Sequence, residues 1–251
     1  MEVDAGAGDS PRSPVRLYLL CALAALASAG VVALGIWQLE RRVWKLDLIS
    51  QIDRRVGAPL VDAPGPARWP VITASTDAYR HVRAAGTWLT GRDTLVQAVT
   101  ALGSGYWLMT PLRTDPGFVI LINRGFVPPD YKTAGDSGAG SRAEISGLLR
   151  ITEPKGGFLR SNDAAADRWY ARDIAAIAEA RGLTDVAPYF IDAAATPGGA
   201  PPVGGLTVIN LPNNHLVYAI TWFVLAAMAG AAGVHLVRGE RARVDRAGDH
   251  R

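Results

Sequence analysis

Two long apolar runs lie near the ends of this 251-residue chain and dominate its pattern of hydrophobic and polar positions. Leu17 to Leu39 and His215 to Val237 are each 23 residues long and contain no Asp, Glu, Lys or Arg. A helix rises about 1.5 Å per residue, so each run reaches roughly 34 Å and can cross a hydrocarbon core of about 30 Å. The pattern predicts two transmembrane helices, residues 17–39 and 215–237.

The first run has an alternative interpretation as a cleaved signal peptide, because Ala27-Ser28-Ala29 fits the small-residue cleavage pattern. The apolar stretch continues to Ile36, however, and is longer than the roughly 7–15 residues of a signal peptide's apolar region. We therefore expect a retained helix. The first fourteen residues hold three acidic side chains against Arg12 alone. Mitochondrial presequences are basic, so this start favours a bacterial protein.

The segment between the runs, residues 40–214, has the pattern of short strands separated by Gly and Pro. Candidate strands are residues 93–99, 106–112, 118–122, 144–151 and 188–192, and residues 61–70 and 196–205 are expected to be loose linkers. One helix is predicted after Asp173, a suitable N-cap, and ends at Gly182. We expect an α+β membrane protein: two transmembrane helices flank an extracytoplasmic, mainly antiparallel β domain with one inserted helix.

Basic residues near the second run predict the orientation of the chain in the membrane. The tail of residues 238–251 holds five Arg, whereas residues 193–214 hold no Lys or Arg. The positive-inside tendency places this tail in the cytoplasm, and two crossings place residues 1–16 there as well. The central domain is then periplasmic and the protein lies in the bacterial inner membrane. Arg41, Arg42 and Lys45 argue for the opposite orientation, but long translocated domains weaken the rule.

Composition and motifs exclude several classes of function. The chain has a net charge of +3 without a concentrated basic segment in its middle, which argues against nucleic acid. Cys21 is the single cysteine, so there is no internal disulfide and no CxxC motif. No phosphate loop, zinc-protease motif or nucleophile elbow is present, and His81 is the single histidine of the central domain. We expect no enzyme and interpret His81 as a surface residue.

The start of the second run is the most informative segment. Pro212 is suited to a position before a helix, and the two Asn residues that follow can cap it. On a helix, His215 shares its face with Tyr218, Ala219 and Trp222. Such a face suits an interfacial aromatic belt, and it also suits a flat apolar macrocycle whose iron takes the imidazole as an axial ligand. Both interpretations stay open on spacing alone.

Four segments resemble the Surfeit-locus family of cytochrome c oxidase assembly factors. They are GIWQLERRVWK (35–45), NRGFVP (123–128), DRWYARD (167–173) and NNHLVYAITWF (213–223). They occur in order between the two apolar runs, and together they extend over most of the chain. Phe126 and Val217 depart from the family pattern, in which Trp and a polar residue are common at these positions.

The resemblance implies a chaperone that binds haem a and helps insert it into the large subunit of a haem-copper oxidase. Haem a would be transient cargo from the haem a synthesis enzymes. His215 matches the family's proposed axial ligand to the haem iron, and Trp222 matches the aromatic residue beside it. Because the iron bond needs a neutral imidazole, loading should weaken in acid. The alternative is an assembly scaffold that binds oxidase subunits without carrying haem.

Other motif residues have two possible roles each. Arg41 and Arg124 could bind the haem propionates, because guanidinium binds carboxylate through two parallel hydrogen bonds. They could equally anchor the domain or meet lipid phosphates. Trp37 is expected to be an interfacial anchor, and Trp169 and Tyr170 are expected to pack in the core.

Overall fold

The computed structural model describes residues 14–89, 91–131, 140–154, 160–195, 200–207, 209 and 211–248. They belong to two compact units. The first combines the ends of the chain, Met1–Ile49 and Leu211–Arg251, and the second is Ser50–Asn210. The units are therefore described separately.

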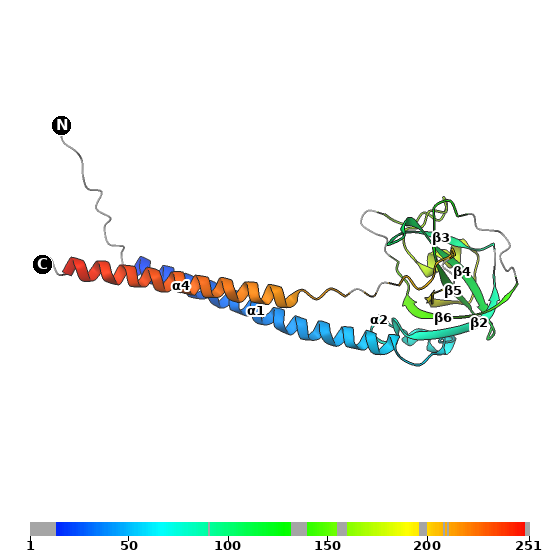
Figure 1. Ribbon diagram of the computed structural model, residues 1–251, viewed down its shortest axis with the longest axis horizontal. Helices are drawn as coiled ribbons and strands as arrows, with labels where there is room; N and C mark the ends of the chain where they lie inside the picture. Colours follow the sequence, from blue (N-terminus) through cyan, green and yellow to red (C-terminus); the bar gives the residue numbers. More distant parts are fainter. Residues whose placement is uncertain are drawn as a thin grey trace, which may run out of the picture. The chain divides into compact units, whose positions relative to one another are not determined.

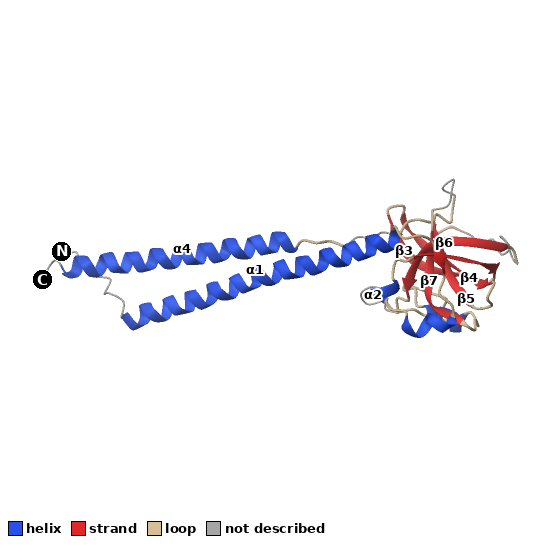
Figure 2. Ribbon diagram, turned by 90° about the horizontal axis from the view of Figure 1, so that it is seen from below, coloured by secondary structure: helices blue, strands red, loops and turns tan. Residues whose placement is uncertain are grey.

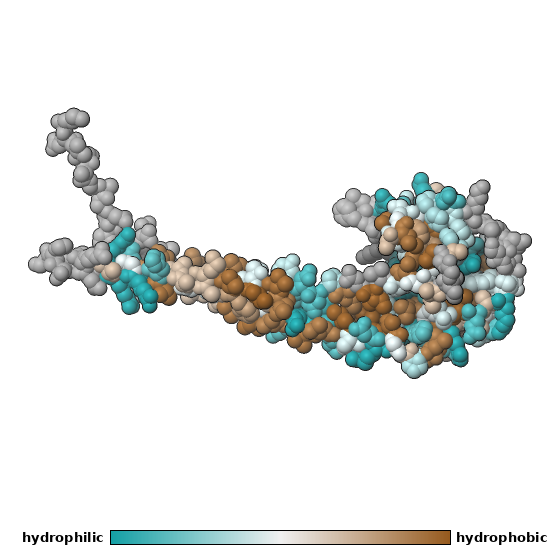
Figure 3. All heavy atoms as spheres, viewed as in Figure 1, coloured by the Kyte–Doolittle hydropathy of each residue, from teal (hydrophilic) through white to brown (hydrophobic). Residues whose placement is uncertain are grey.

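Two long antiparallel helices make up the first unit (Figures 1 and 2). α1 is Pro14–Val56, whose last turns belong to the second unit, and α4 is His215–Gly248. Cys21–Val56 and His215–Arg243 are long and apolar enough to cross a membrane. Hydrophobic residues cover the middle of the pair in Figure 3. The two helices contain the predicted segments 17–39 and 215–237. α1 continues from residue 40 to Val56, in the segment expected to belong to the central domain, and α4 continues past residue 237 to Gly248.

The second unit is a β barrel. Its strands are β1 (Val61–Asp62), β2 (His81–Trp88), β3 (Thr94–Thr100), β4 (Gly103–Thr114), β5 (Val119–Val127), β6 (Arg142–Ile151) and β7 (Val186–Ala193). They are ordered β1-β2-β6-β7-β5-β4-β3, and β2 also pairs with β4. This extra pairing closes five strands into a barrel (Figure 2). Gly86 permits the closure, because a Cβ there would collide with the backbone of Arg113.

The mainly antiparallel domain is confirmed, in the form of a mixed barrel. β5 and β7 run parallel, as do β1 and β2, and the other pairings are antiparallel. All five predicted strands are present. β2 begins at His81, which is partly buried, and the expected linker 61–70 contains β1 and a 3₁₀ helix, η1 (Pro66–Val71). The expected linker 196–205 lies partly outside the described residues.

Alternating residues of β5 face two hydrophobic clusters, which explains its continuous apolar sequence. Ile120 and Ile122 belong to one cluster, with Leu112, Tyr189 and others. Leu121 belongs to a second cluster, with residues of the helix α3 (Ile174–Ala180). The strand is thus covered on both faces.

The predicted helix is confirmed as α3. The Asp173 side chain caps it by accepting a hydrogen bond from the backbone N–H of Ala176 at 3.2 Å. Gly182 follows with φ of 60°, a conformation that favours glycine at a helix end. A second short helix, α2 (Ala74–Asp77), escaped the sequence analysis because four residues are too few for a helical period.

Candidate functional site

The start of α4 holds the predicted site, and the helix begins at His215 itself. The first turn is closed by the backbone N–H of Tyr218, which donates to the oxygen of Asn214 at 3.3 Å. The side-chain oxygen of Asn213 is buried and has no hydrogen-bond partner within the described part of the chain, so Asn213 does not cap the helix. This leaves one buried acceptor two residues before His215.

His215 contacts the other membrane helix. Its Nδ1 lies 2.8 Å from Oε1 of Gln38 on α1, a hydrogen bond between residues 177 positions apart. Among the described residues, this is the contact of the imidazole, and Nε2 has no hydrogen-bond partner there. Gln38 lies in the GIWQLERRVWK segment, but nothing in the sequence alone assigns it a role. The signal that could have found it is a single amide side chain at the end of an apolar run.

Close packing of α1 and α4 holds this contact in place. Gly35, one turn before Gln38, is buried, and a Cβ there would lie 2.6 Å from Cε1 of Phe223. Ala219 is fully buried, and it lies one turn after His215 and one turn before Phe223. Positions 215, 219 and 223 share one face of a helix. The face of α4 that carries His215 is therefore the one packed on α1.

The aromatic residues of the predicted site lie beside this packed face. Tyr218 is 55% exposed and Trp222 is partly buried. Because Ala219 is closed off, a flat ring near His215 would lie against Tyr218 and Trp222 rather than over Ala219. The site thus opens sideways, toward the part of the helix surface that a bilayer would cover.

Arg41 and Trp37 flank Gln38 on α1. Arg41, one turn after Gln38, is exposed and places its guanidinium 3.9 Å from the ring centroid of Trp44. Trp37 is 52% exposed. Arg41 therefore lies just past the apolar run of the helix that contacts His215, and its guanidinium makes no hydrogen bond with the described residues.

Arg124 belongs to the barrel. It lies on β5, partly buried, with its guanidinium 5.2 Å from the ring centroid of Trp88. The next residue, Gly125, has φ of 130°, and a Cβ there would collide with the backbone of Val203. The glycine of the NRGFVP segment thus allows the backbone at residues 203–204 to pass directly against β5.

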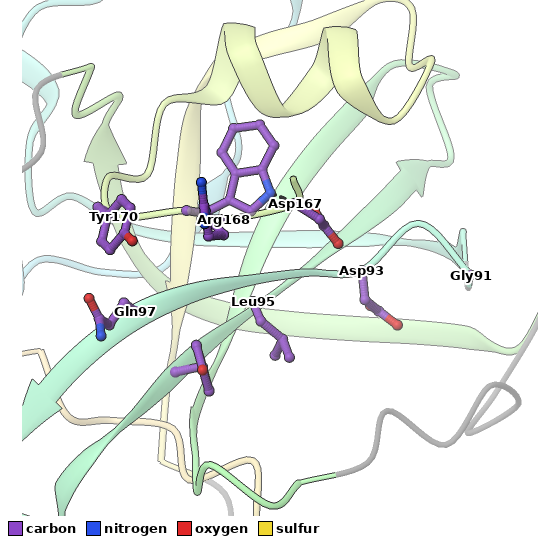
Figure 4. A pocket seen from close by; sticks show the side chains of 9 residues that line it. Gly91, Asp93, Leu95, Gln97, Asp167, Arg168 and Tyr170 are labelled. Carbon is purple, nitrogen blue, oxygen red and sulfur yellow. Dashed lines mark hydrogen bonds between the residues drawn. The ribbon is translucent and has the colours of Figure 1, made fainter. Parts of the chain in front are cut away.

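The DRWYARD segment borders a pocket of about 390 Å³ beside the edge strand β3 (Figure 4). Trp169 is 2% exposed, as expected of a core residue, and Tyr170 is partly buried. The Trp169 indole N–H donates to Asp167 at 2.7 Å, and its backbone oxygen accepts from the N–H of Gln97 on β3 at 2.8 Å. The segment covers part of the β3 edge, which is a structural role.

A buried ion cluster lines a second cavity of about 450 Å³ in the barrel. Asp192, 4% exposed, accepts hydrogen bonds from Arg150 at 2.9 Å, Arg172 at 3.1 Å, Asn123 at 2.8 Å and Thr207 at 3.0 Å. Both guanidinium groups also bind Glu153. These four hydrogen bonds use all the acceptor positions of the Asp192 carboxylate, and the cluster links β5, β6 and β7.

The geometry excludes a multidentate metal site among the described residues, since no group of three His, Cys, Asp or Glu side chains converges there. His215 could supply one protein ligand to an iron atom that a macrocycle already holds on four sides. That is the chemistry the start of α4 can perform.

Comparison with known proteins gives a consistent result. The model of the SURF1 family matches residues 25–227. The chain is 34% identical over 219 residues to Surfeit locus protein 1 of Homo sapiens, covering 77% of this chain and 69% of the human protein. It is 34% identical over 236 residues to a SURF1-like protein of Monosiga brevicollis, covering 85% and 87% respectively.

Proposed function

The chain belongs to the SURF1 family, and from this premise we propose that it carries haem a to the large subunit of a haem-copper oxidase. The family comprises non-enzymatic proteins known as cytochrome oxidase assembly factors. In this proposal haem a is cargo: the chain receives it from the haem a synthesis enzymes, holds it through His215 and releases it to the nascent oxidase.

The hydrogen bond between His215 and Gln38 is the observation that supports this proposal most. It engages one ring nitrogen of an imidazole at the start of an apolar helix, while the described residues leave the other nitrogen without a partner. Haem a is largely apolar, so it can approach such a site from the bilayer. A single axial ligand gives binding that is reversible, as delivery requires.

Tyr218 and Trp222 are proposed to bind the face of the macrocycle. Both lie beside His215 on α4 and keep part of their surface open. Aromatic rings bury large apolar areas at low entropic cost, which suits a flat ligand. Their role is to hold the ring system while His215 binds the iron.

Arg41 and Arg124 are proposed to bind the propionates. Arg41 is the stronger candidate, because it lies one turn after Gln38, just past the apolar run of α1, and is exposed. The stacking of Arg41 on Trp44 leaves its N–H groups free to bind a carboxylate. Arg124 is stacked on Trp88 within the barrel, which equally supports a structural role.

We propose that both termini are cytoplasmic and that the barrel lies in the periplasm of a bacterial cell. The five Arg residues after the second apolar run support this orientation, as does the absence of Lys and Arg from residues 193–214. The site would then lie at the outer face of the inner membrane.

Haem content of the assembled oxidase tests the proposed delivery. In cells that lack the chromosomal copy, wild type should restore haem a in the large subunit, whereas His215→Ala should leave that subunit deficient. His235→Ala is the control, because His235 lies twenty residues further along α4. If His215→Ala restores haem a fully at equal protein level, the chain acts as a scaffold and the carrier proposal is wrong.

A further inference from the structure

The contact between Gln38 and His215 determines more than the position of the imidazole. The acceptor at 2.8 Å from Nδ1 is Oε1, an amide oxygen, and an amide oxygen can only accept a hydrogen bond. With the Gln38 amide in this orientation, the proton of the imidazole lies on Nδ1. We infer that Gln38 is a positioning residue that holds His215 in the Nδ1–H tautomer, with the lone pair of Nε2 free for iron.

This inference rests on the proposed function, because the tautomer matters only if Nε2 binds a metal. Iron in a porphyrin can approach Nε2 but not Nδ1, since Nδ1 is crowded by the Cβ atom of the histidine itself. In water the opposite tautomer, with the proton on Nε2, is the more populated form of a histidine side chain. An acceptor at Nδ1 reverses that preference, as hydrogen-bond partners of metal-binding histidines generally do.

The surroundings of Gln38 make the preference strong. Gln38 and His215 are both partly buried, between two helices whose other neighbouring contact, Gly35 against Phe223, is apolar. The buried side-chain oxygen of Asn213 is another acceptor two residues before His215, but the imidazole contacts Oε1 of Gln38. Leaving the Nδ1–H donor unpaired in such a place is unfavourable. α1 is thus a functional half of the site rather than an anchor alone.

Nitrogen NMR of the haem-free full-length protein tests the tautomer without any ligand. Protonated and unprotonated ring nitrogens give well-separated signals in protein labelled with ¹⁵N-histidine and placed in lipid nanodiscs. The chain has four histidines, and His215→Ala identifies the signals of interest. The inference expects the neutral imidazole of His215 to carry its proton on Nδ1, with Nε2 unprotonated.

Two variants of Gln38 distinguish the effect of its acceptor oxygen from the effect of the size of its side chain. Gln38→Leu removes the acceptor and should shift His215 toward the Nε2–H form. Gln38→Glu keeps an acceptor oxygen beside Nδ1 and should keep that nitrogen protonated. His235 provides an internal reference whose signals should not move. A wild-type His215 with its proton on Nε2, or one that Gln38→Leu leaves unchanged, would overturn the inference.

Binding of protohaem then tests the consequence. Titration of the nanodisc-embedded chain should show Gln38→Leu binding about 10- to 100-fold more weakly than wild type. Gln38→Glu should recover most of that loss. Equal affinity of Gln38→Leu and wild type would overturn the positioning role. If the NMR pattern is as expected but His215→Ala binds protohaem as tightly as wild type, the haem-carrier proposal fails instead.

Discussion

Gly35 of α1 and Phe223 of α4 pack so closely that a Cβ at position 35 would lie 2.6 Å from Cε1 of the phenyl ring. This contact lies one turn from Gln38 along α1 and two turns from His215 along α4. Membrane helices approach each other most closely at such small residues, because lipid supplies no hydrophobic drive for their association. The separation of the two spans at the site is therefore set by Gly35.

Replacing this glycine should separate the helices. Gly35→Leu forces the Phe223 ring to move and is expected to cost about 1–3 kcal/mol of stability, as overpacking does in protein cores. It should also lengthen the Gln38–His215 contact and reduce haem binding. Thermal unfolding in detergent and protohaem titration measure the two effects.

Gly30 supplies the matched control. It lies on the same helix, and a Cβ there would have no neighbour within 4 Å. Gly30→Leu should leave both thermal stability and haem binding at the wild-type level or slightly above it. Equal losses in the two variants would mean that helix composition, not close packing, determines the result.

Breaking the buried ion cluster should destabilise the barrel. Asp192→Ala leaves Arg150 and Arg172 without their buried partner, at an expected cost of about 3–5 kcal/mol. Asp115→Ala removes an exposed pair with Arg142 and should have no measurable effect. Pulse proteolysis of the full-length protein in denaturant reports both. A small effect of Asp192→Ala would show that the cluster is dispensable.

Asp77 should make the barrel sensitive to acid. Burial alone would raise the pKa of this carboxyl, but hydrogen bonds from Thr76, Arg80 and the Thr73 backbone outweigh it and hold the pKa below its ordinary 3.8. Because the pKa is lower in the folded protein, the carboxyl stabilises the fold at any pH above its pKa in the unfolded chain. That stabilisation is lost as the pH falls through the pKa of the folded state.

The stability difference between wild type and Asp77→Asn should therefore be constant near neutral pH and shrink as the pH falls below about 4. Denaturant titrations of both proteins over a pH series measure it. A difference that grows on acidification would contradict the lowered pKa.

Labelling of single cysteines tests the proposed orientation. Cys21 is removed by Cys21→Ser, and Pro116→Cys or Gly239→Cys is then added; both positions are exposed. A membrane-impermeant maleimide should label position 116 in intact cells and position 239 only after lysis. The reverse pattern would place the barrel in the cytoplasm.

The sequence predicted the spans, five strands and the capped helix, because each depends on local periodicity or on a single capping residue. It could not predict the parallel pairing of β5 with β7, since that register depends on contacts between distant segments. The role of Gln38 was missed for the same reason. Nothing local links it to a histidine 177 residues away. The expectation for Ala219 also depended on one helix alone, whereas its full burial follows from the packing of two.

The proposed bond between His215 and the iron of haem a underlies the carrier function. Its most direct measurement is the reduced spectrum and haem a content of the full-length protein purified from cells that make haem a. Wild type and His235→Ala should carry haem a at similar levels, and His215→Ala should lose most of it. Equal haem a in wild type and His215→Ala would contradict the claim.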